Sequence, residues 1–132
     1  MVRRAVNLAT EDELSEAVGI RLINEWNDRL LVELRFRRGG NGYLRSRIRN
    51  FLEIARTSPL VMITDLDRGP CPSELRSRWV GKLRPPRNFV LRVAVREIEA
   101  WLLADADAIR ELFGDRASKR LPDDPDAVQE PK

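Results

Sequence analysis

Short apolar runs alternate along the chain with longer segments in which apolar residues recur at helical spacing. The runs predict four strands, at residues 3–9, 30–36, 60–64 and 88–95. The spacing predicts helices at residues 11–26, 43–56 and 73–80 and from residue 97 to 113, as one helix or two. Strands that alternate with helices are typical of a parallel sheet with helices on its faces. We therefore expect an α/β fold with a mostly parallel central sheet of four strands.

Polar residues mark the expected helix ends. Thr10 is placed to cap the first helix, with Glu13 as its capping-box partner. Ser58 precedes a proline and should end the second helix, because proline disfavours helical conformation in the residue before it. Ser73 is placed to cap the third helix.

The chain has 132 residues, no histidine and one cysteine, Cys71. The lack of histidine excludes Ser-His-Asp and Cys-His catalysis. A single cysteine excludes an intramolecular disulfide, and the first residues do not form a signal peptide, so we expect a cytoplasmic protein. No apolar run reaches the ~20 residues that span a membrane, so no membrane partner is expected. Residues 1–115 are expected to form one domain, and residues 116–132 an acidic, proline-rich tail or a truncated connection.

The net charge is +3, with arginines concentrated in the middle of the chain. A basic middle indicates a polyanionic partner such as nucleic acid, although a solvated helix face would look the same. The residues expected to contact a nucleic-acid backbone are Arg45, Arg47, Arg49, Lys82 and Arg84. The glycine-rich residues 39–42 could cradle a phosphate or simply form a flexible turn.

The strongest chemical signal is the apolar run at residues 60–64, which ends in Asp65 and Asp67. On a strand, residues two apart point to the same face. The carboxyl ends of parallel strands are where open α/β sheets bind ligands. Two close carboxylates favour a hard divalent cation, Mg²⁺ or Mn²⁺. The alternative is structural, with the aspartates forming an Asx turn and a helix cap.

Acidic residues also follow two other predicted strands. They are Glu11, Asp12 and Glu13 after the first strand, and Glu97 and Glu99 after the fourth. If the first, third and fourth strands are neighbours, these side chains converge with Asp65 and Asp67 at one edge of the sheet. A metal ion held there would lower the pKa of a bound water and screen phosphate charge.

This combination resembles the Toprim domain of topoisomerases, primases and overcoming-lysogenization-defect nucleases. It is more similar to bacterial Toprim-like proteins of unknown function that are encoded beside ATPases in defence loci. The likeness covers residues 5–115 and lies in residues 11–17, in the Asp-x-Asp pair, and in the Glu-Ala-Trp-Leu-Leu sequence within residues 96–105. It implies a single Toprim-like, Rossmann-like domain.

By this resemblance, Glu11 is a general base or metal-linked acid, Asp65 and Asp67 are the metal-binding pair, and Glu99 is a late acidic site residue. Asp12 stands where the family has glycine, which leaves the choice between Glu11 and Glu13 open.

The resemblance further implies a Mg²⁺-dependent nuclease in anti-phage defence, with an ATPase partner that controls access to nucleic acid. One alternative is a non-catalytic interaction subunit that assembles with an ATPase or with itself. Another is a phosphatase-like module in which Asp65 is the nucleophile. Homo-oligomerisation is left open.

Overall fold

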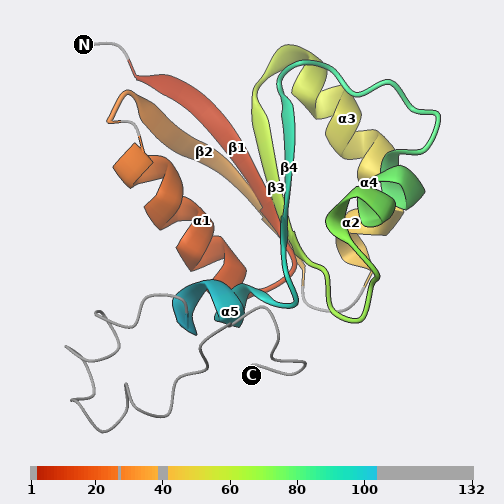
Figure 1. Ribbon diagram of the computed structural model, residues 1–132. Helices are drawn as coiled ribbons and strands as arrows, with labels where there is room; N and C mark the ends of the chain where they lie inside the picture. Colours follow the sequence, from red (N-terminus) through yellow and green to blue (C-terminus); the bar gives the residue numbers. More distant parts are fainter. Residues whose placement is uncertain (1–2, 27, 39–41, 104–132) are drawn as a thin grey trace, which may run out of the picture.

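A parallel four-stranded sheet forms the centre of the computed structural model, which describes residues 3–26, 28–38 and 42–103 (Figure 1). The strands lie in the order β2-β1-β3-β4, and all three pairings are parallel. They are β1 (Arg4–Thr10), β2 (Leu30–Arg37), β3 (Leu60–Asp65) and β4 (Phe89–Ala94). The predicted α/β architecture is confirmed, and it is consistent with a single Rossmann-like domain. The sheet order also makes β1, β3 and β4 neighbours, which the convergence of acidic residues requires.

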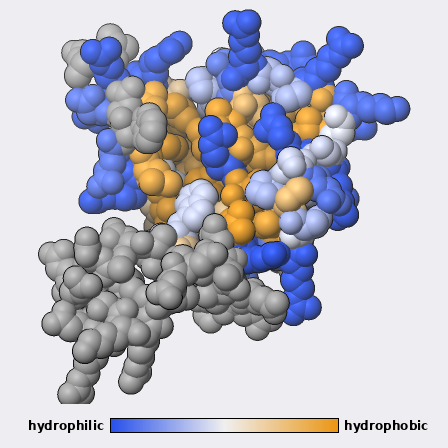
Figure 2. Space-filling view, in the orientation of Figure 1, coloured by the Kyte–Doolittle hydropathy of each residue, from blue (hydrophilic) through white to orange (hydrophobic). Residues whose placement is uncertain are grey.

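Helices cover both faces of the sheet (Figure 1). On one face, α1 (Glu13–Trp26) and α5 (Ile98–Leu103) enclose an apolar cluster that includes Leu8 and Ile63. The other face carries α2 (Tyr43–Ser46), α3 (Ile48–Thr57) and α4 (Pro72–Val80). A second apolar cluster lies beneath these three helices. Figure 2 shows apolar side chains in the middle of this view, between the outer helices. No helix of the described residues is long and apolar enough to cross a membrane.

The predicted helix at residues 43–56 is divided in two. Arg47 leaves the helical conformation, with φ −107° and ψ 12°, and separates α2 from α3. In α3 the residues Ile48, Phe51, Leu52 and Ala55 are buried at the spacing of one helix face. The apolar pattern therefore located α3 correctly. It could not locate the break, because Arg47 is an exposed residue and the break does not disturb the apolar pattern.

Two predicted helix caps are wrong. Thr10 is the buried last residue of β1, and Asp12 caps α1 instead, since its Oδ1 accepts the amide of Ser15 at 2.8 Å. In α4 the cap position belongs to Cys71 and the helix starts at a proline, whose fixed φ suits the first helical position. Ser73 therefore lies inside the helix.

Helix α1 lies very close to the sheet at Gly19. A Cβ atom at that position would come within 2.9 Å of both methyl groups of Leu8 and 3.1 Å of a methyl group of Ile63. Only glycine allows this approach, which brings the helix onto β1 and β3.

The edge strand β2 contains a β-bulge opposite Asn7. Its register with β1 passes from Val6↔Val32 to Leu8↔Arg35, so β2 has one extra residue there. The buried side chain of Asn7 stabilises this point, because its Oδ1 accepts the amide of Leu34 at 3.3 Å.

The bulge changes which side chains face each helical layer. Val32 before the bulge packs in the cluster beneath α1, whereas Phe36 after it packs in the cluster beneath α3. The neighbours of Phe36, Arg35 and Arg37, turn towards α1 and form ion pairs with Glu16 at 3.7 and 3.2 Å. The bulge thus places an aromatic ring and two paired arginines on opposite faces of the same strand.

The fold prediction extends beyond the described residues in two places. The continuation of the last helix over residues 105–113 and the tail at residues 116–132 both lie outside the residues that the structure describes.

Candidate metal and nucleic-acid site

The carboxyl ends of β1 and β3 open into a pocket of about 210 Å³, which we call the acidic pocket. It is lined by Glu11, Gly42, Arg45, Thr64, Asp65, Leu66, Asp67, Leu75 and Trp79. Glu11 follows β1, and the two aspartates end and follow β3. The structure therefore brings together three of the acidic residues that the sequence predicted as one site.

Asp65 is the last residue of β3 and is only 8% exposed. Its Oδ1 accepts the backbone amide of Ile98 at 2.7 Å, at the start of α5. The carboxylate is thus a cap for a helix 33 residues further along the chain. Asp65 thus caps a helix, as the structural alternative predicted. The capped helix is α5, however, and not the segment that directly follows the aspartates.

Asp67 reaches the pocket in a way that the sequence did not predict. The expectation that both aspartates share one face of a strand is wrong, because β3 ends at Asp65 and Asp67 has a left-handed conformation with φ 53°. Its amide donates to the carbonyl of Arg96 at 2.6 Å, and the Arg96 guanidinium donates to the carbonyls of Asp67 at 3.1 Å and Gly69 at 3.0 Å. These bonds fix the backbone and leave the Asp67 side chain exposed.

Thr64 adds a buried hydroxyl to the acidic pocket. It continues the face of β3 on which Leu60 and Met62 pack beneath α3 and α4. The side chain is 2% exposed, and its Oγ1 has no hydrogen-bond partner among the described residues. Buried hydroxyls normally have a partner, so this oxygen is available to a water or to a ligand in the pocket. Sequence reasoning missed Thr64, and its place directly before Asp65 was the available signal.

The oxygen donors of the acidic pocket fit Mg²⁺ or Mn²⁺ rather than a soft metal. Mg²⁺ is commonly held by one or two carboxylates, with waters and substrate phosphates completing its octahedron. Glu11 and Asp67 supply such carboxylates. Within the described ranges, no group of three or more acidic or thiol side chains lies close enough to hold a metal ion alone.

The remaining predicted acidic residues lie in different places. Glu13 begins α1 and has a carboxylate oxygen 4.0 Å from the guanidinium of Arg37, and it does not line the acidic pocket. This geometry favours Glu11 over Glu13. Glu99 lies within α5, but its side chain is outside what the structure describes.

The five basic residues predicted to contact nucleic acid are all exposed. Arg45 lines the acidic pocket, where it forms no ion pair with a carboxylate of the described residues. Arg49 and Arg84 line another hollow of about 280 Å³, and Lys82 lies in the same connection between α4 and β4 as Arg84. Arg47 lines a third pocket, between β2 and α3. Four of the five cations thus line three hollows beside α2 and α3.

Comparisons with protein-family models, with curated proteins and with solved structures gave no match.

Proposed function

We propose that the protein is a Mg²⁺- or Mn²⁺-dependent nuclease that hydrolyses nucleic-acid phosphodiesters. The observation that carries this proposal is that Glu11 and Asp67 line one pocket together with Arg45 at the carboxyl ends of parallel strands. This is the edge of an open α/β sheet at which ligands bind. Carboxylates beside a guanidinium suit a substrate that is itself an anion and arrives with a cation.

Each side chain has a distinct part in this proposal. Asp67 holds the metal ion, and Glu11 acts as the base or as an additional ligand. Arg45 contacts a phosphate of the substrate, because a guanidinium pairs well with phosphate oxygens. When bound, the ion would lower the pKa of a water and stabilise the charge that develops on the phosphate.

Asp65 contributes mainly through position. Its bond to Ile98 holds the start of α5, the helix that carries Glu99, and its charge adds to the negative potential of the pocket. The buried carboxylate of Asp65 already accepts a hydrogen bond from a backbone amide, which makes it a poor nucleophile. The structure therefore gives no support to a phosphatase-like reaction through Asp65. Glu99 stays a proposed additional acid.

The test uses Asp67→Asn. Asparagine tolerates the left-handed conformation of residue 67, so the backbone is kept while the charge is lost. Plasmid, linear and single-stranded substrates are incubated with Mg²⁺ or Mn²⁺. We expect cleavage to fall by at least about 100-fold, since the loss of outer-shell partners alone costs about 10–100-fold. Calorimetry should show weaker divalent binding in the same variant.

Asp28→Asn is the matched control. Asp28 is exposed, precedes β2 at the opposite end of the sheet, and loses the same charge. It should cleave and bind metal like the unmodified protein. Cleavage by Asp67→Asn at the unmodified rate would remove the catalytic assignment.

A second candidate is a non-catalytic interaction subunit. Leu31 and Leu34 on the edge strand β2 are 47% and 51% exposed, and an edge strand also offers unpaired backbone groups. The partner would be an ATPase, as the resemblance implies, or a second copy of the chain. Two results together would favour this function over the nuclease. The folded, unmodified protein would bind no divalent ion, and the double variant Leu31→Ser with Leu34→Ser would no longer form the complex with the partner.

A further inference from the structure

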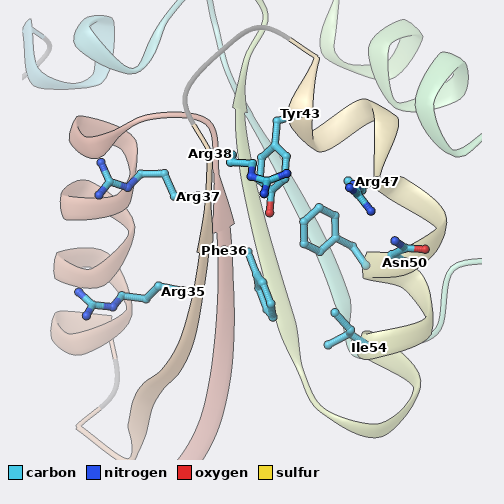
Figure 3. A pocket seen from close by; sticks show the side chains of 9 residues that line it. Arg35, Phe36, Arg37, Arg38, Tyr43, Arg47, Asn50 and Ile54 are labelled. Atoms are coloured by element: carbon cyan, nitrogen blue, oxygen red, sulfur yellow. The ribbon is translucent and has the colours of Figure 1, made fainter.

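A pocket of about 370 Å³ lies between β2 and the helices α2 and α3 (Figure 3). This β2–α3 pocket is lined by Arg35, Phe36, Arg37, Arg38, Tyr43, Arg47, Asn50, Phe51 and Ile54. Its volume is within the range of small-ligand sites, about 300–1,000 Å³. Of these residues only Arg47 was predicted to contact nucleic acid, because the pocket forms from segments that only the fold brings together.

Aromatic rings form the floor of the β2–α3 pocket. Phe51 is buried and makes edge-on contacts with Phe36, at 5.6 Å between centroids, and with Tyr43, at 5.9 Å. Phe36 and Tyr43 are half-buried, so each keeps accessible surface beside the cavity. Packing on Phe51 holds both rings in place, which lowers the entropy cost of stacking a ligand on them.

The charge of the pocket is positive. Arg35 and Arg37 turn away towards α1 and their ion pairs (Figure 3). Arg38 from the end of β2 and Arg47 from the start of α3 have no carboxylate partner among the described residues, and no acidic residue lines the pocket. Asn50 adds an amide that can both donate and accept hydrogen bonds.

We propose that the β2–α3 pocket binds one nucleotide of an unpaired nucleic-acid strand. The base stacks on Phe36 or Tyr43, its polar edge meets the amide of Asn50, and the flanking phosphate binds Arg38 and Arg47. Aromatic stacking together with a cationic track is the way proteins hold single strands, whereas a base inside a duplex cannot reach such a pocket.

Helix α2 is the shared wall between the β2–α3 pocket and the acidic pocket. Tyr43 and Arg47 line the first, while Gly42 and Arg45 line the second. A strand whose base occupies the first pocket can therefore place a neighbouring phosphodiester near Glu11 and Asp67. That the bound strand is the substrate rests on the proposed function, but the binding itself does not.

The experiment measures binding in EDTA, by fluorescence anisotropy, so that no cleavage interferes. The probes are a labelled oligo(dT), an abasic strand of equal length and charge, and a duplex. We expect oligo(dT) to bind about tenfold more tightly than the abasic strand, in keeping with the value of one stacked base. The duplex should bind no better than the abasic strand.

Variants separate the parts of the pocket. Tyr43→Leu keeps apolar packing on Phe51 and should reduce the preference for oligo(dT) to about twofold or less. Arg38→Gln with Arg47→Gln should weaken binding of both strands and flatten the salt dependence, because fewer counterions are released. Arg21→Gln is the control, since Arg21 is an exposed arginine of α1, on the other face of the sheet.

Thermal melting checks that Tyr43→Leu is folded. Should it unfold, Asn50→Ala provides the same test from an exposed position of α3, with a smaller loss of base preference expected. Competition by free thymidine monophosphate identifies the source of the nucleotide. If thymidine monophosphate displaced oligo(dT) at a concentration equal to that of the oligo(dT) nucleotides, the ligand would be a free nucleotide. That result would overturn the assignment to a strand.

Equal binding of oligo(dT) and the abasic strand by the unmodified protein would overturn the proposal. The outcome is distinct from that of the nuclease test. Base-dependent binding without metal-dependent cleavage would keep this pocket and remove the nuclease, and cleavage without base-dependent binding would do the reverse.

Discussion

The carboxylate of Asp65 accepts a hydrogen bond from the amide of Ile98, with 2.7 Å between Oδ1 and N. Asp65 ends β3, and Ile98 is a fully buried residue at the start of α5. One side chain thus joins the central strand to the helix that follows the edge strand β4. The same residue lines the acidic pocket, so its substitution changes both the stability of the fold and the pocket.

We predict that Asp65→Ala lowers the free energy of unfolding by about 1–3 kcal/mol, because a buried amide loses its charged acceptor. Asp65→Asn keeps an acceptor oxygen and should lose less than half of that. Urea denaturation followed by circular dichroism measures both values.

Asp67→Asn is the reference for this prediction. Its side chain is exposed and makes no ion pair within the described ranges, so its stability should stay within about 0.5 kcal/mol of the unmodified protein. If Asp65→Ala were as stable as Asp67→Asn, the hydrogen bond from the Ile98 amide would not hold α5 in place. The comparison also shows why loss of cleavage in Asp65→Ala alone would not identify a catalytic group.

The architecture could be predicted from the sequence because it follows from local patterns. Apolar runs such as residues 60–64 are long enough only for strands, and the helices between them require parallel pairing. The meeting of Glu11, Asp65 and Asp67 in the acidic pocket follows from the same logic, because the carboxyl ends of parallel strands lie at one edge of the sheet.

Features that depend on distant contacts could not be predicted. The break at Arg47 and the left-handed Asp67 leave no apolar signature. The acceptor role of Asp65 depends on where α5 lies, and the β2–α3 pocket depends on a bulge that turns Phe36 towards α3. For Asp67, Asp65 and the bulge, the hydrogen bonds that fix the conformation come from residues distant in the sequence.

The bulge itself should depend on Asn7, which is 3% exposed. In Asn7→Ala, the amide of Leu34 loses its side-chain acceptor and the site loses volume, so we predict a destabilisation of about 1–3 kcal/mol. Hydrogen exchange should become faster at the amide of Leu34, and urea denaturation gives the free energy of unfolding.

Asn24→Ala on the exposed surface of α1 provides the comparison, with an expected change within about 0.5 kcal/mol. Unchanged exchange at Leu34 in Asn7→Ala would show that the bulge is held by other contacts. Weaker oligo(dT) binding in Asn7→Ala, with the fold intact, would link the bulge to the β2–α3 pocket.

The thiol of Cys71 gives a pH-dependent readout of the start of α4. Its Sγ lies 3.3 Å from the Oγ of Ser73, and the hydrogen bond from that hydroxyl, helped by the backbone amide of Glu74, lowers the pKa of the thiol below its ordinary value. These donors favour the charged form, so removing one must raise the pKa. In Ser73→Ala, alkylation by iodoacetamide should therefore reach half of its maximal rate at a higher pH.

The rate is measured from neutral to alkaline pH, and the single cysteine of the chain makes the signal specific. At a pH near the midpoint, Ser73→Ala has less thiolate and should react more slowly, while the two rates converge at high pH, where both thiols are ionised. Ser77→Ala, an exposed serine of the same helix, should leave the midpoint unchanged. An identical profile for Ser73→Ala and the unmodified protein would mean that the Ser73 hydroxyl does not bond to the thiolate in solution.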